Sequence, residues 1–549
     1  MSEHKNLQDK EIPQVSLAPG FSGPRFLAVR AEDCAALVAS DVVVIGGGVA
    51  GLCAALEAAR ECSVILVTKS ALEESNTRYA QGGIAAVLGE DDSFEEHTRD
   101  TLEAGGVLCH ADVVRSVVSQ GPAAIQRLVN LGGNFDQTRG AISLAREGGH
   151  SRGRIIHARG DSTGLEVQSV LEARVRAEAR IRVLENTFAV DLVTADNAVT
   201  GVVVLPKKGR FTLLRCRAVV LASGGGGRIY RETTNPRVAT GDGLAMAFRA
   251  GAELRGLEFF QFHPTTLYVP GIPRMLISET VRGEGGLLRD RDGRRFMPDR
   301  HPLAELAPRD VVSRAIVERI VATGDSCGYL DVTHLDQQKF RVRFPGITSV
   351  LDEYGIDFAR EPIPIHPAAH YMIGGVLADI AGRTSVPGLF AAGEVSCTGL
   401  HGANRLGSNS LLEGLVCGTA AGRSACEVER SGTARFDDGD LPLRMAPASL
   451  DQRDLWNSLR AVMWKRVAIE RDAISLRFAI ERLARWSELL FRTRFNDIAG
   501  LELVNAMTVS RLVTAAAAHR TESRGTHFRS DHPEIDNEQW RLDLVIRRA

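Results

Sequence analysis

Short unbroken apolar runs and helical patterns alternate in the first part of this chain. The runs Val42–Ile45 and Val64–Val67 flank a segment rich in alanine and leucine, and similar runs occur within 217–227 and at 388–392. Unbroken apolar runs of this length are typical of strands buried on both faces of a parallel sheet. Residues 41–70 therefore predict a β-α-β unit, and the later runs predict further strands of the same domain.

From about residue 450 onward, apolar residues recur every three or four positions, which predicts amphipathic helices. Three stripes have this spacing: Leu455, Leu459, Val462, Met463 and Val467; Leu476, Ile480 and Leu483; and Leu503, Met507 and Leu512. We expect these stripes to pack together as a small helical bundle, with Trp456 and Trp464 serving packing rather than cofactor binding. No apolar run is expected to cross a membrane.

Between about 257 and 371, prolines and charged loops replace the regular pattern, with one helix expected near 309–323. The chain has 549 residues, too many for a single core. We expect an α/β Rossmann-like domain built from residues 41–256 and 372–441, interrupted by an inserted α+β capping domain at 257–371. A C-terminal helical bundle follows at 442–549. Residues 1–40 lack an apolar signal core and are expected to form a flexible extension.

Two glycine-rich turns mark a candidate nucleotide site. Gly46-x-Gly48-x-x-Gly51 follows an apolar strand and opens a helix, the context in which this spacing binds a pyrophosphate rather than only forming a tight turn. Far along the chain, a second glycine-rich loop at 393–408 precedes a helix expected to begin near Asn409. One cofactor held from two distant segments is the pattern of a large FAD enzyme. The second strand ends in Thr68-Lys69-Ser70, without the acidic residue of an NAD ribose site, which disfavours a plain NAD dehydrogenase.

Composition and charge narrow the choice of function. The formal net charge is −2 and the pI is about 6.7, which argues against nucleic acid as the main partner. The nine cysteines form no Cys-x-x-Cys pair, so neither an iron–sulfur cluster nor a structural zinc site is expected. Their odd number and scattered positions favour reduced thiols and a cytoplasmic location.

Longer motifs, in a fixed order, resemble those of the succinate dehydrogenase/fumarate reductase flavoprotein family. They are TRYAQGGIAAV (77–87), REGGHS (146–151), TTNP with GDG (233–243), EFFQFHPT (258–265), SETVRGEGG (278–286), LAPRDVVSRAI (306–316), PAAHYMIGGV (367–376), GEVSCTGLHGANRLGSNSLLE (393–413) and ESRGTHFRSD (522–531). The resemblance covers residue 41 to about residue 531, and it implies an enzyme that uses FAD and acts on a dicarboxylate.

The resemblance also implies where FAD binds. The implied contacts are Gly46, Gly47, Gly48, Val49, Ala50 and Gly51 at the pyrophosphate, Lys69 after the second strand, Asn76, Thr77, Arg78, Tyr79, Ala80, Gln81, Gly82 and Gly83 beside the flavin, Asp242 and Glu394 at cofactor hydroxyls, and Ser410 and Leu411 at the isoalloxazine. A helix N-terminus at the isoalloxazine stabilises the negative charge of the reduced ring. Succinate dehydrogenases attach FAD covalently through a histidine in this loop. This chain has Asn76 there, so the resemblance implies non-covalent FAD.

A dicarboxylate needs cationic or hydrogen-bonding groups at both ends. The resemblance proposes His263, Thr265, His370 and Arg405 for this role. Lone histidines are often structural, and only the motif context favours binding for these two. The resemblance gives proton transfer to Arg309, relayed through Glu279 and Arg282. Since arginine is a poor base in water, two alternatives stay open for Arg309: an interdomain ion pair and a clamp on a carboxylate.

Glu147 bears on the choice of substrate. The dicarboxylate reductases of the family have an aromatic residue at this position, whereas a carboxylate would attract an α-ammonium group. The alternative is a surface loop glutamate. Glu147 and Asn76 favour the branch of the family that oxidises L-aspartate to iminoaspartate, by hydride transfer from Cα or Cβ to flavin N5.

This branch implies reoxidation by O2 or fumarate and a functional link to quinolinate synthase in de novo NAD biosynthesis. Two other functions remain possible. The first is a soluble fumarate reductase or succinate dehydrogenase flavoprotein, which would share nearly every motif. The second is a non-catalytic FAD-binding protein, which would not need both histidines and both arginines.

Overall fold

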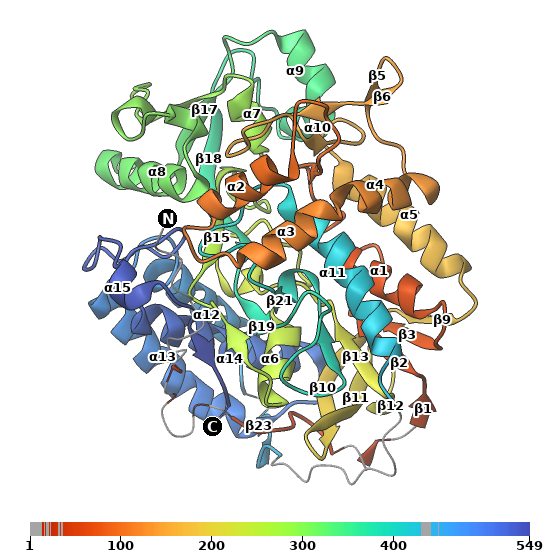
Figure 1. The fold of residues 1–549 in the computed structure, drawn as a ribbon. Helices are drawn as coiled ribbons and strands as arrows, with labels where there is room; N and C mark the ends of the chain where they lie inside the picture. The colour runs from red at the N-terminus through yellow and green to blue at the C-terminus, as the bar shows by residue number, and fades with distance from the viewer. Residues whose placement is uncertain are drawn as a thin grey trace.

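A computed structural model describes residues 14–15, 17, 21, 23–30, 33–34, 37–429, 441–447 and 449–548. A five-stranded parallel sheet, with the order β20-β13-β2-β3-β9, forms the centre of the nucleotide-binding region (Figure 1). In that order the strands are Leu389–Ala391, Ala218–Leu221, Val42–Ile45, Val64–Val67 and Ile181–Leu184. Every residue of the first four is buried, as unbroken apolar runs require. The predicted parallel sheet is confirmed.

Helices α1 (Val49–Ala58) and α11 (Asn409–Cys426) pack closely against each other beside this sheet. Gly418 and Gly422 of α11 face the backbone of Ala50 and Ala54. An added Cβ would lie 2.5 and 2.3 Å from their carbonyl oxygens. These two glycines allow the helices to approach each other closely. Both helices begin near the carboxyl ends of the central strands, where ligands bind in α/β sheets.

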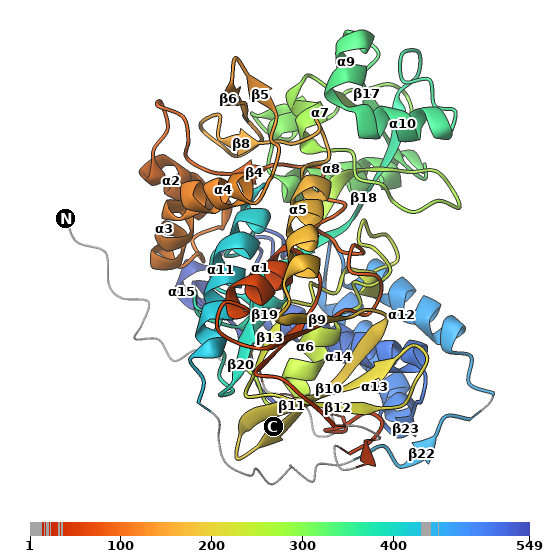
Figure 2. The ribbon, with the colours of Figure 1, turned by 90° about the vertical axis from the view of Figure 1, so that its right-hand side faces the viewer.

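Smaller elements surround the central sheet. One mixed sheet has the order β1-β12-β11-β10 (Leu37–Ala39, Thr212–Arg215, Ala198–Pro206, Thr187–Ala195), and another has the order β21-β19-β14-β24 (Ser396–Cys397, Gly375–Leu377, Leu254–Arg255, Val545–Ile546). A three-stranded sheet has the order β4-β8-β7 (Ile84–Ala85, Ile155–Ile156, Leu144–Ala145). It lies near the helices α2 to α5 (Phe94–Ala104, Ala111–Ser119, Gly121–Asn130, Thr163–Ala177), as Figure 2 shows. β5 (Gln137–Thr138) and β6 (Ala141–Ile142) form a hairpin.

The capping region has a sheet and a hydrophobic core of its own. Its antiparallel sheet has the order β15-β18-β17-β16 (Phe260–Leu267, Ile363–Met372, Gly328–Asp331, Leu287–Arg289), with helices α7 to α10 (Glu279–Gly283, Arg309–Thr323, Gln337–Arg343, Pro345–Glu353) around it. The region, green in Figure 1, stands above the nucleotide-binding region. The helix expected near 309–323 is confirmed as α8.

The C-terminal helices are α12 (Gln452–Arg466), α13 (Ala473–Phe491), α14 (Ile498–His519) and the short α15 (Asn537–Trp540). An aspartate side chain caps each of the three long helices: Asp451, Asp472 and Asp497 accept from the N–H three residues later at 3.0, 2.9 and 2.8 Å. The predicted stripes are buried at most positions, but Ile480 is 42% exposed, so its place in the second stripe was wrong. Trp464 packs against Phe262 and His366, as the packing prediction implies.

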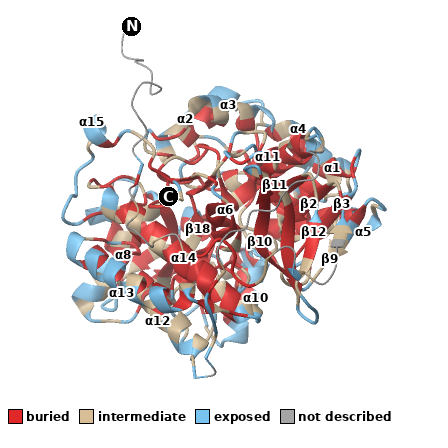
Figure 3. Cartoon of the chain, turned by 90° about the horizontal axis from the view of Figure 1, so that it is seen from below, coloured by how far each residue is buried: buried red, intermediate tan, exposed pale blue. Residues whose placement is uncertain are grey.

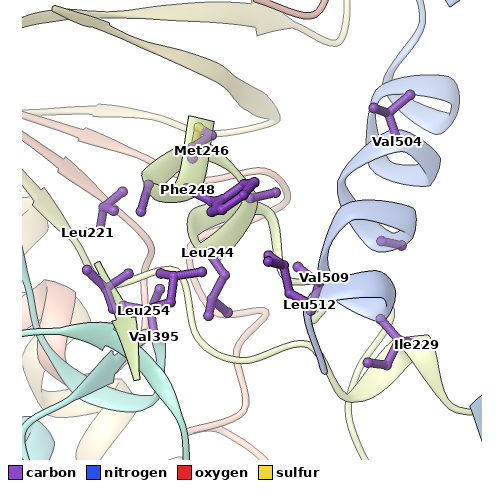
Figure 4. Close-up of a cluster of buried hydrophobic side chains, with 14 of the residues drawn as sticks. Leu221, Ile229, Leu244, Met246, Phe248, Leu254, Val395, Val504, Val509 and Leu512 are labelled. Atoms are coloured by element: carbon purple, nitrogen blue, oxygen red, sulfur yellow. The ribbon is translucent and has the colours of Figure 1, made fainter. Parts of the chain in front are cut away.

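Helix α14 joins the bundle to the nucleotide-binding region. Its Val509 and Leu512 approach Leu244 of α6 (Asp242–Arg249) in one continuous apolar cluster (Figure 4). By length and composition α14 would be apolar enough to cross a membrane, contrary to the expectation from sequence. However, 78% of its apolar stretch is buried inside the protein (Figure 3). Core packing therefore accounts for its apolar character.

Two expectations need correction. Residues 24–28 of the predicted flexible extension are buried, with Phe26 and Leu27 only 1% and 2% exposed, because this segment packs on the core around β10. Residues 1–13, and residues 430–440 at the predicted domain boundary, lie outside the described residues. Cys62, four residues after α1, and Cys426, the last residue of α11, are paired as a disulfide, so the expectation that all thiols are reduced was wrong for these two.

Candidate active site

A cavity of about 1280 Å³ is lined by both the nucleotide-binding region and the capping region. Its walls include the glycine turn 46–50, the loop 74–83 and the start of α11 on one side, and residues 271–276 and Arg309 on the other. Helices α1 and α11 begin at this cavity, and neither of their N-cap residues, Gly48 and Ser408, forms a side-chain cap. Val49 N, at the start of α1, donates to Thr77 Oγ1 at 3.0 Å. The dipoles of both helices favour an anion or an electron-rich ring at these N-termini.

The glycine turn has the shape that a bound pyrophosphate requires. Gly46 has a φ of 117°, and an added Cβ would lie 2.1 Å from Ala222 O, so no other residue fits. Gly51 does not border the cavity. An added Cβ there would lie 2.0 Å from Gly46 O, so Gly51 instead lets α1 pack against the turn. The other eighteen residues expected to contact FAD all line the cavity.

Several buried polar atoms of cavity-lining residues point to a polar ligand. Asn76 Oδ1, Gln81 Oε1 and Ser223 Oγ have no hydrogen-bond partner among the described residues. Buried polar atoms are nearly always hydrogen-bonded. Together with the uncapped helix ends and the glycine turn, these atoms fit FAD.

The C-terminal helix α14 contacts two residues that line the cavity, Lys69 and Asp242. Lys69 Nζ lies 2.7 Å from both Asp242 Oδ2 and Glu502 Oε1. Asn505 donates to Asp242 Oδ1 at 2.8 Å and accepts from Arg249 at 2.8 Å. The sequence analysis missed Glu502 and Asn505. The signal for them was polarity at positions on an otherwise apolar, buried helix.

Asn76 connects the flavin loop to the second glycine-rich segment. Its Nδ2 donates to Glu394 Oε2 at 2.8 Å, and Met372 N donates to Glu394 Oε1 at 3.0 Å. Burial raises the pKa of Glu394, and these hydrogen bonds act in the opposite direction.

His263 and His370 face each other from the antiparallel strands β15 and β18, with ring centroids 5.2 Å apart. Burial is the main cause that lowers the pKa of both well below the usual value. Arg309 adds to the effect at His263, and Arg405 adds to it at His370. Both imidazoles are therefore neutral hydrogen-bonding groups at neutral pH. Thr265 lies beside His263, but its hydroxyl donates to Ile277 O at 2.8 Å and it does not border the cavity.

Two arginines from different regions meet at Gln261. Arg309 Nη1 and Arg405 Nη2 each donate to Gln261 Oε1 at 3.0 Å. Arg405 has no acidic ion-pair partner in the described part of the chain. Burial, followed by repulsion from Arg309, lowers its pKa to about 10. It remains a cation at neutral pH, and a bound carboxylate would relieve the repulsion. The sequence analysis did not single out Gln261, although it lies in the EFFQFHPT motif.

The three residues expected in a proton relay form one connected chain. Arg309 Nε donates to Glu279 Oε2 at 2.8 Å, and Arg282 Nη2 lies 3.3 Å from Glu279 Oε1. Burial favours the neutral form of Glu279, but Arg309 and Arg282 together lower its pKa below the usual value. Arg282 is buried behind Glu279 and does not line the cavity, whereas Arg309 and Glu279 do.

Glu147 borders the cavity and is only 6% exposed, so it is not a surface loop residue. Ser408 Oγ donates to its Oε2 at 2.7 Å. His157 Nε2 lies 3.5 Å from Oε1, near enough for electrostatic attraction but too far for a full hydrogen bond. Among the described residues, nothing else satisfies Oε1. Burial alone would raise the pKa of Glu147, but His157 and then Ser408 lower it to about 2. The side chain is a carboxylate at neutral pH.

Comparison with known proteins decides the family. The model of the FAD binding domain matches residues 41–411, and that of the fumarate reductase flavoprotein C-terminus matches residues 456–548. The L-aspartate oxidase of Streptomyces coelicolor is 45% identical over 540 residues, covering 93% of this chain and 92% of the relative. That of a Nostoc species is 39% identical and covers 96% of each. The chain belongs to the L-aspartate oxidase family.

Solved structures confirm the predicted fold class for this member of the L-aspartate oxidase family. A chain of the E. coli quinol fumarate reductase has a TM-score of 0.85 and 32% identity, covering 92% of this chain and 94% of its own. Another quinol–fumarate reductase chain also has a TM-score of 0.85, with 31% identity and 93% and 98% coverage. The protein is an FAD-dependent oxidoreductase. Its sequence identity to the two L-aspartate oxidases exceeds its identity to these fumarate reductases. The alternative function, fumarate reduction, is therefore supported only by resemblance to the wider family.

Proposed function

We propose that this protein oxidises L-aspartate to iminoaspartate and that Glu147 binds the substrate amino group. One observation carries the proposal: a buried, ionised carboxylate with an unsatisfied oxygen borders the same cavity as the cation Arg405 and the neutral rings of His263 and His370. An ammonium group satisfies that oxygen and compensates its charge. A diacid without an amino group brings only further negative charge to it.

The substrate carboxylates bind to the cationic side of the cavity. Arg405, positively charged and without an acidic partner in the described residues, suits one carboxylate, and the neutral rings of His263 and His370 donate hydrogen bonds. Thr265 acts by holding His263, since its N–H donates to His263 Nδ1 at 3.3 Å. FAD bound along the glycine turn and the flavin loop supplies the acceptor for the hydride that leaves the substrate.

Oxidation of an amine to an imine releases a hydride and a proton, so the site needs a path for the proton. Arg309 borders the cavity and donates to Glu279, and the buried Arg282 lies next, with Nη2 3.3 Å from Glu279 Oε1. We assign proton transfer to these three residues. The chain supports this role over that of a simple carboxylate clamp, which would not need an ionised partner behind the arginine.

We also propose that FAD is held without a covalent bond, because Asn76 takes the place of the linking histidine and is engaged with Glu394. Acid precipitation of the holoenzyme then releases all flavin into the supernatant. Yellow colour that stays with the precipitated chain would contradict this.

Reoxidation by O2 or fumarate completes the cycle. The product is a reactive imine, which favours a downstream consumer such as quinolinate synthase in NAD biosynthesis. A physical complex with that enzyme would make coupled product formation faster than when the two enzymes are kept apart, and an equal rate would argue against channelling. A cytoplasmic location stays a prediction from the sequence.

Glu147→Gln tests the proposal directly, because it keeps the volume of the side chain and removes its charge. We expect kcat/KM for L-aspartate to fall by about tenfold or more, the usual effect of losing a charged hydrogen bond. Fumarate reduction with a reduced dye should persist. Equal losses on both substrates, or no loss on aspartate, would count against a role in amine recognition.

A further inference from the structure

His157 lies behind Glu147, in a position that no role described so far uses. Its side chain is buried and does not border the cavity. Its Nε2 nevertheless lies 3.5 Å from Glu147 Oε1, while Ser408 holds the other oxygen. The two oxygens of the carboxylate therefore have different neighbours: Ser408, which lines the cavity, and His157, which does not.

The same small sheet positions both partners of Glu147. Strand β4 pairs with β8 through Ile84 and Ile156, and His157 directly follows β8. Ala85 of β4 also donates its N–H to Ser408 O at 3.1 Å. Ser408 itself has a φ of 63°, an uncommon conformation for a serine, which places it at the start of α11. Backbone hydrogen bonds thus fix His157 and Ser408 relative to each other.

Glu147 needs such restraint because competing cations are close. An added Cβ on Gly407 would lie 3.2 Å from Arg309 Nη2 and 3.3 Å from Glu147 Oε2, so both groups border the same small space. The charge of Glu147 also acts on Arg405. A mobile carboxylate here would form an ion pair with an arginine, and both groups would then be unavailable to a substrate.

We propose that His157 is a positioning residue that holds the Glu147 carboxylate away from Arg309 and Arg405, and so sets the preference for a diacid with an amino group. This inference rests on the proposed function. The His157 ring, with Nε2 3.5 Å from Oε1, attracts this oxygen from a position outside the cavity lining. Glu147 stays directed at the substrate amine, and the arginines stay free for the carboxylates.

The test compares His157→Leu, which removes the donor, with His157→Gln, which keeps an N–H, in FAD-loaded enzyme. For His157→Leu we expect KM for L-aspartate to rise about tenfold, kcat to change little, and KM for fumarate to stay nearly constant or to fall. His157→Gln should recover part of the loss. Each variant can also be titrated with L-aspartate and with succinate while the flavin absorbance is followed. The affinities measured in this way, without turnover, should place the variants in the same order.

A double-mutant cycle separates action through Glu147 from general damage. If His157 acts through Glu147, adding His157→Leu to Glu147→Gln leaves the ratio of aspartate to fumarate kcat/KM unchanged. His97→Gln is the matched control, since His97 is also buried and bonds at the start of α11, to Asn409 Oδ1 at 2.8 Å rather than to Glu147. Its effect should be the same on both substrates.

Two outcomes would overturn the inference: equal losses on both substrates in His157→Leu, or a full additional loss in the double variant. If the unmodified enzyme does not oxidise L-aspartate, the proposed function fails first. If it does, and His157→Leu keeps its preference for aspartate over fumarate, only the role of His157 fails.

Discussion

Arg309 and Arg405 donate to the same oxygen, Oε1 of Gln261, although one begins a helix of the capping region and the other precedes α11. Two like charges are thus held together by a neutral acceptor. Glu279 offsets the charge of Arg309, whereas Arg405 has no acidic partner among the described residues, so a substrate carboxylate would supply the missing negative charge. The arrangement also joins the two regions at the point where substrate binds.

Gln261 should therefore matter for activity although it has no acid–base chemistry of its own. Gln261→Met keeps a similar volume and removes the shared acceptor. We expect kcat/KM for L-aspartate to fall by about tenfold to a hundredfold, because both arginines lose their fixed positions. Steady-state kinetics at matched flavin content measures this. Unchanged kinetics would show that substrate alone orders the two arginines.

A variant of Arg309 can distinguish a role in proton transfer from the two other roles considered for this residue, a carboxylate clamp and an interdomain ion pair. Arg309→Leu should lower kcat by more than about a hundredfold while flavin content is retained, since loss of a proton-transfer group affects the chemical step. A clamp would show mainly as a higher KM. An interdomain ion pair would show as a lower melting temperature with nearly normal kcat, so kinetics and thermal unfolding of the same variant decide among the three.

The network at Lys69 predicts that the C-terminal helix supports cofactor binding. In Glu502→Gln, Lys69 keeps Asp242 but loses its second carboxylate. FAD affinity, measured by quenching of flavin fluorescence on titration of the apoenzyme, should weaken several-fold. Glu481→Gln is the control, because Glu481 is exposed on α13. If both variants bind FAD equally, α14 contributes packing only.

Buried histidines predict loss of stability in mild acid. Burial is the main cause that lowers the pKa of His97 to about 4, and it also lowers the pKa of His150, His263, His370 and His527. The unfolded chain, with histidine pKa values near 6.5, takes up protons first as the pH falls. Stability is thus full above about pH 6.5 and declines below it, by up to about 1.4 kcal/mol per pH unit for each histidine.

Urea unfolding at pH 7 and pH 5.5 measures this decline, and the midpoint should drop clearly. His97→Gln removes one of the titrating groups, so its midpoint should depend less steeply on pH than that of the unmodified protein. A midpoint that is constant over this range would contradict the assignment of these rings as neutral and buried.

Local patterns predicted the elements of this fold well. Unbroken apolar runs identified β2 and β3, and the glycine-rich turns predicted α1 and the start of α11 at Asn409. Ile480 was misplaced because a periodic apolar stripe does not reveal which side a neighbouring helix covers. The buried segment around Phe26 was missed because its partners, such as those on β10, are distant in the sequence.

The residues absent from the sequence analysis share one property: they act on another side chain. Gln261, Ser408 and Asn505 each touch a predicted site residue that lies far away along the chain, whereas His157 lies near Glu147, ten positions earlier. Sequence spacing carries no information about such contacts. The predicted site residues, in contrast, lie in sequence motifs. Eighteen of the nineteen residues expected to contact FAD line one cavity.

Reduction of the bound flavin without oxygen tests the central claim most directly. Purified holoenzyme would be mixed anaerobically with L-aspartate or with succinate while flavin absorbance is followed near 450 nm, roughly the usual flavin band. We predict bleaching by L-aspartate, little or none by succinate, and recovery of colour on adding air or fumarate. Bleaching by succinate and not by L-aspartate would contradict amine recognition by Glu147 and would place this chain among the dicarboxylate dehydrogenases in activity.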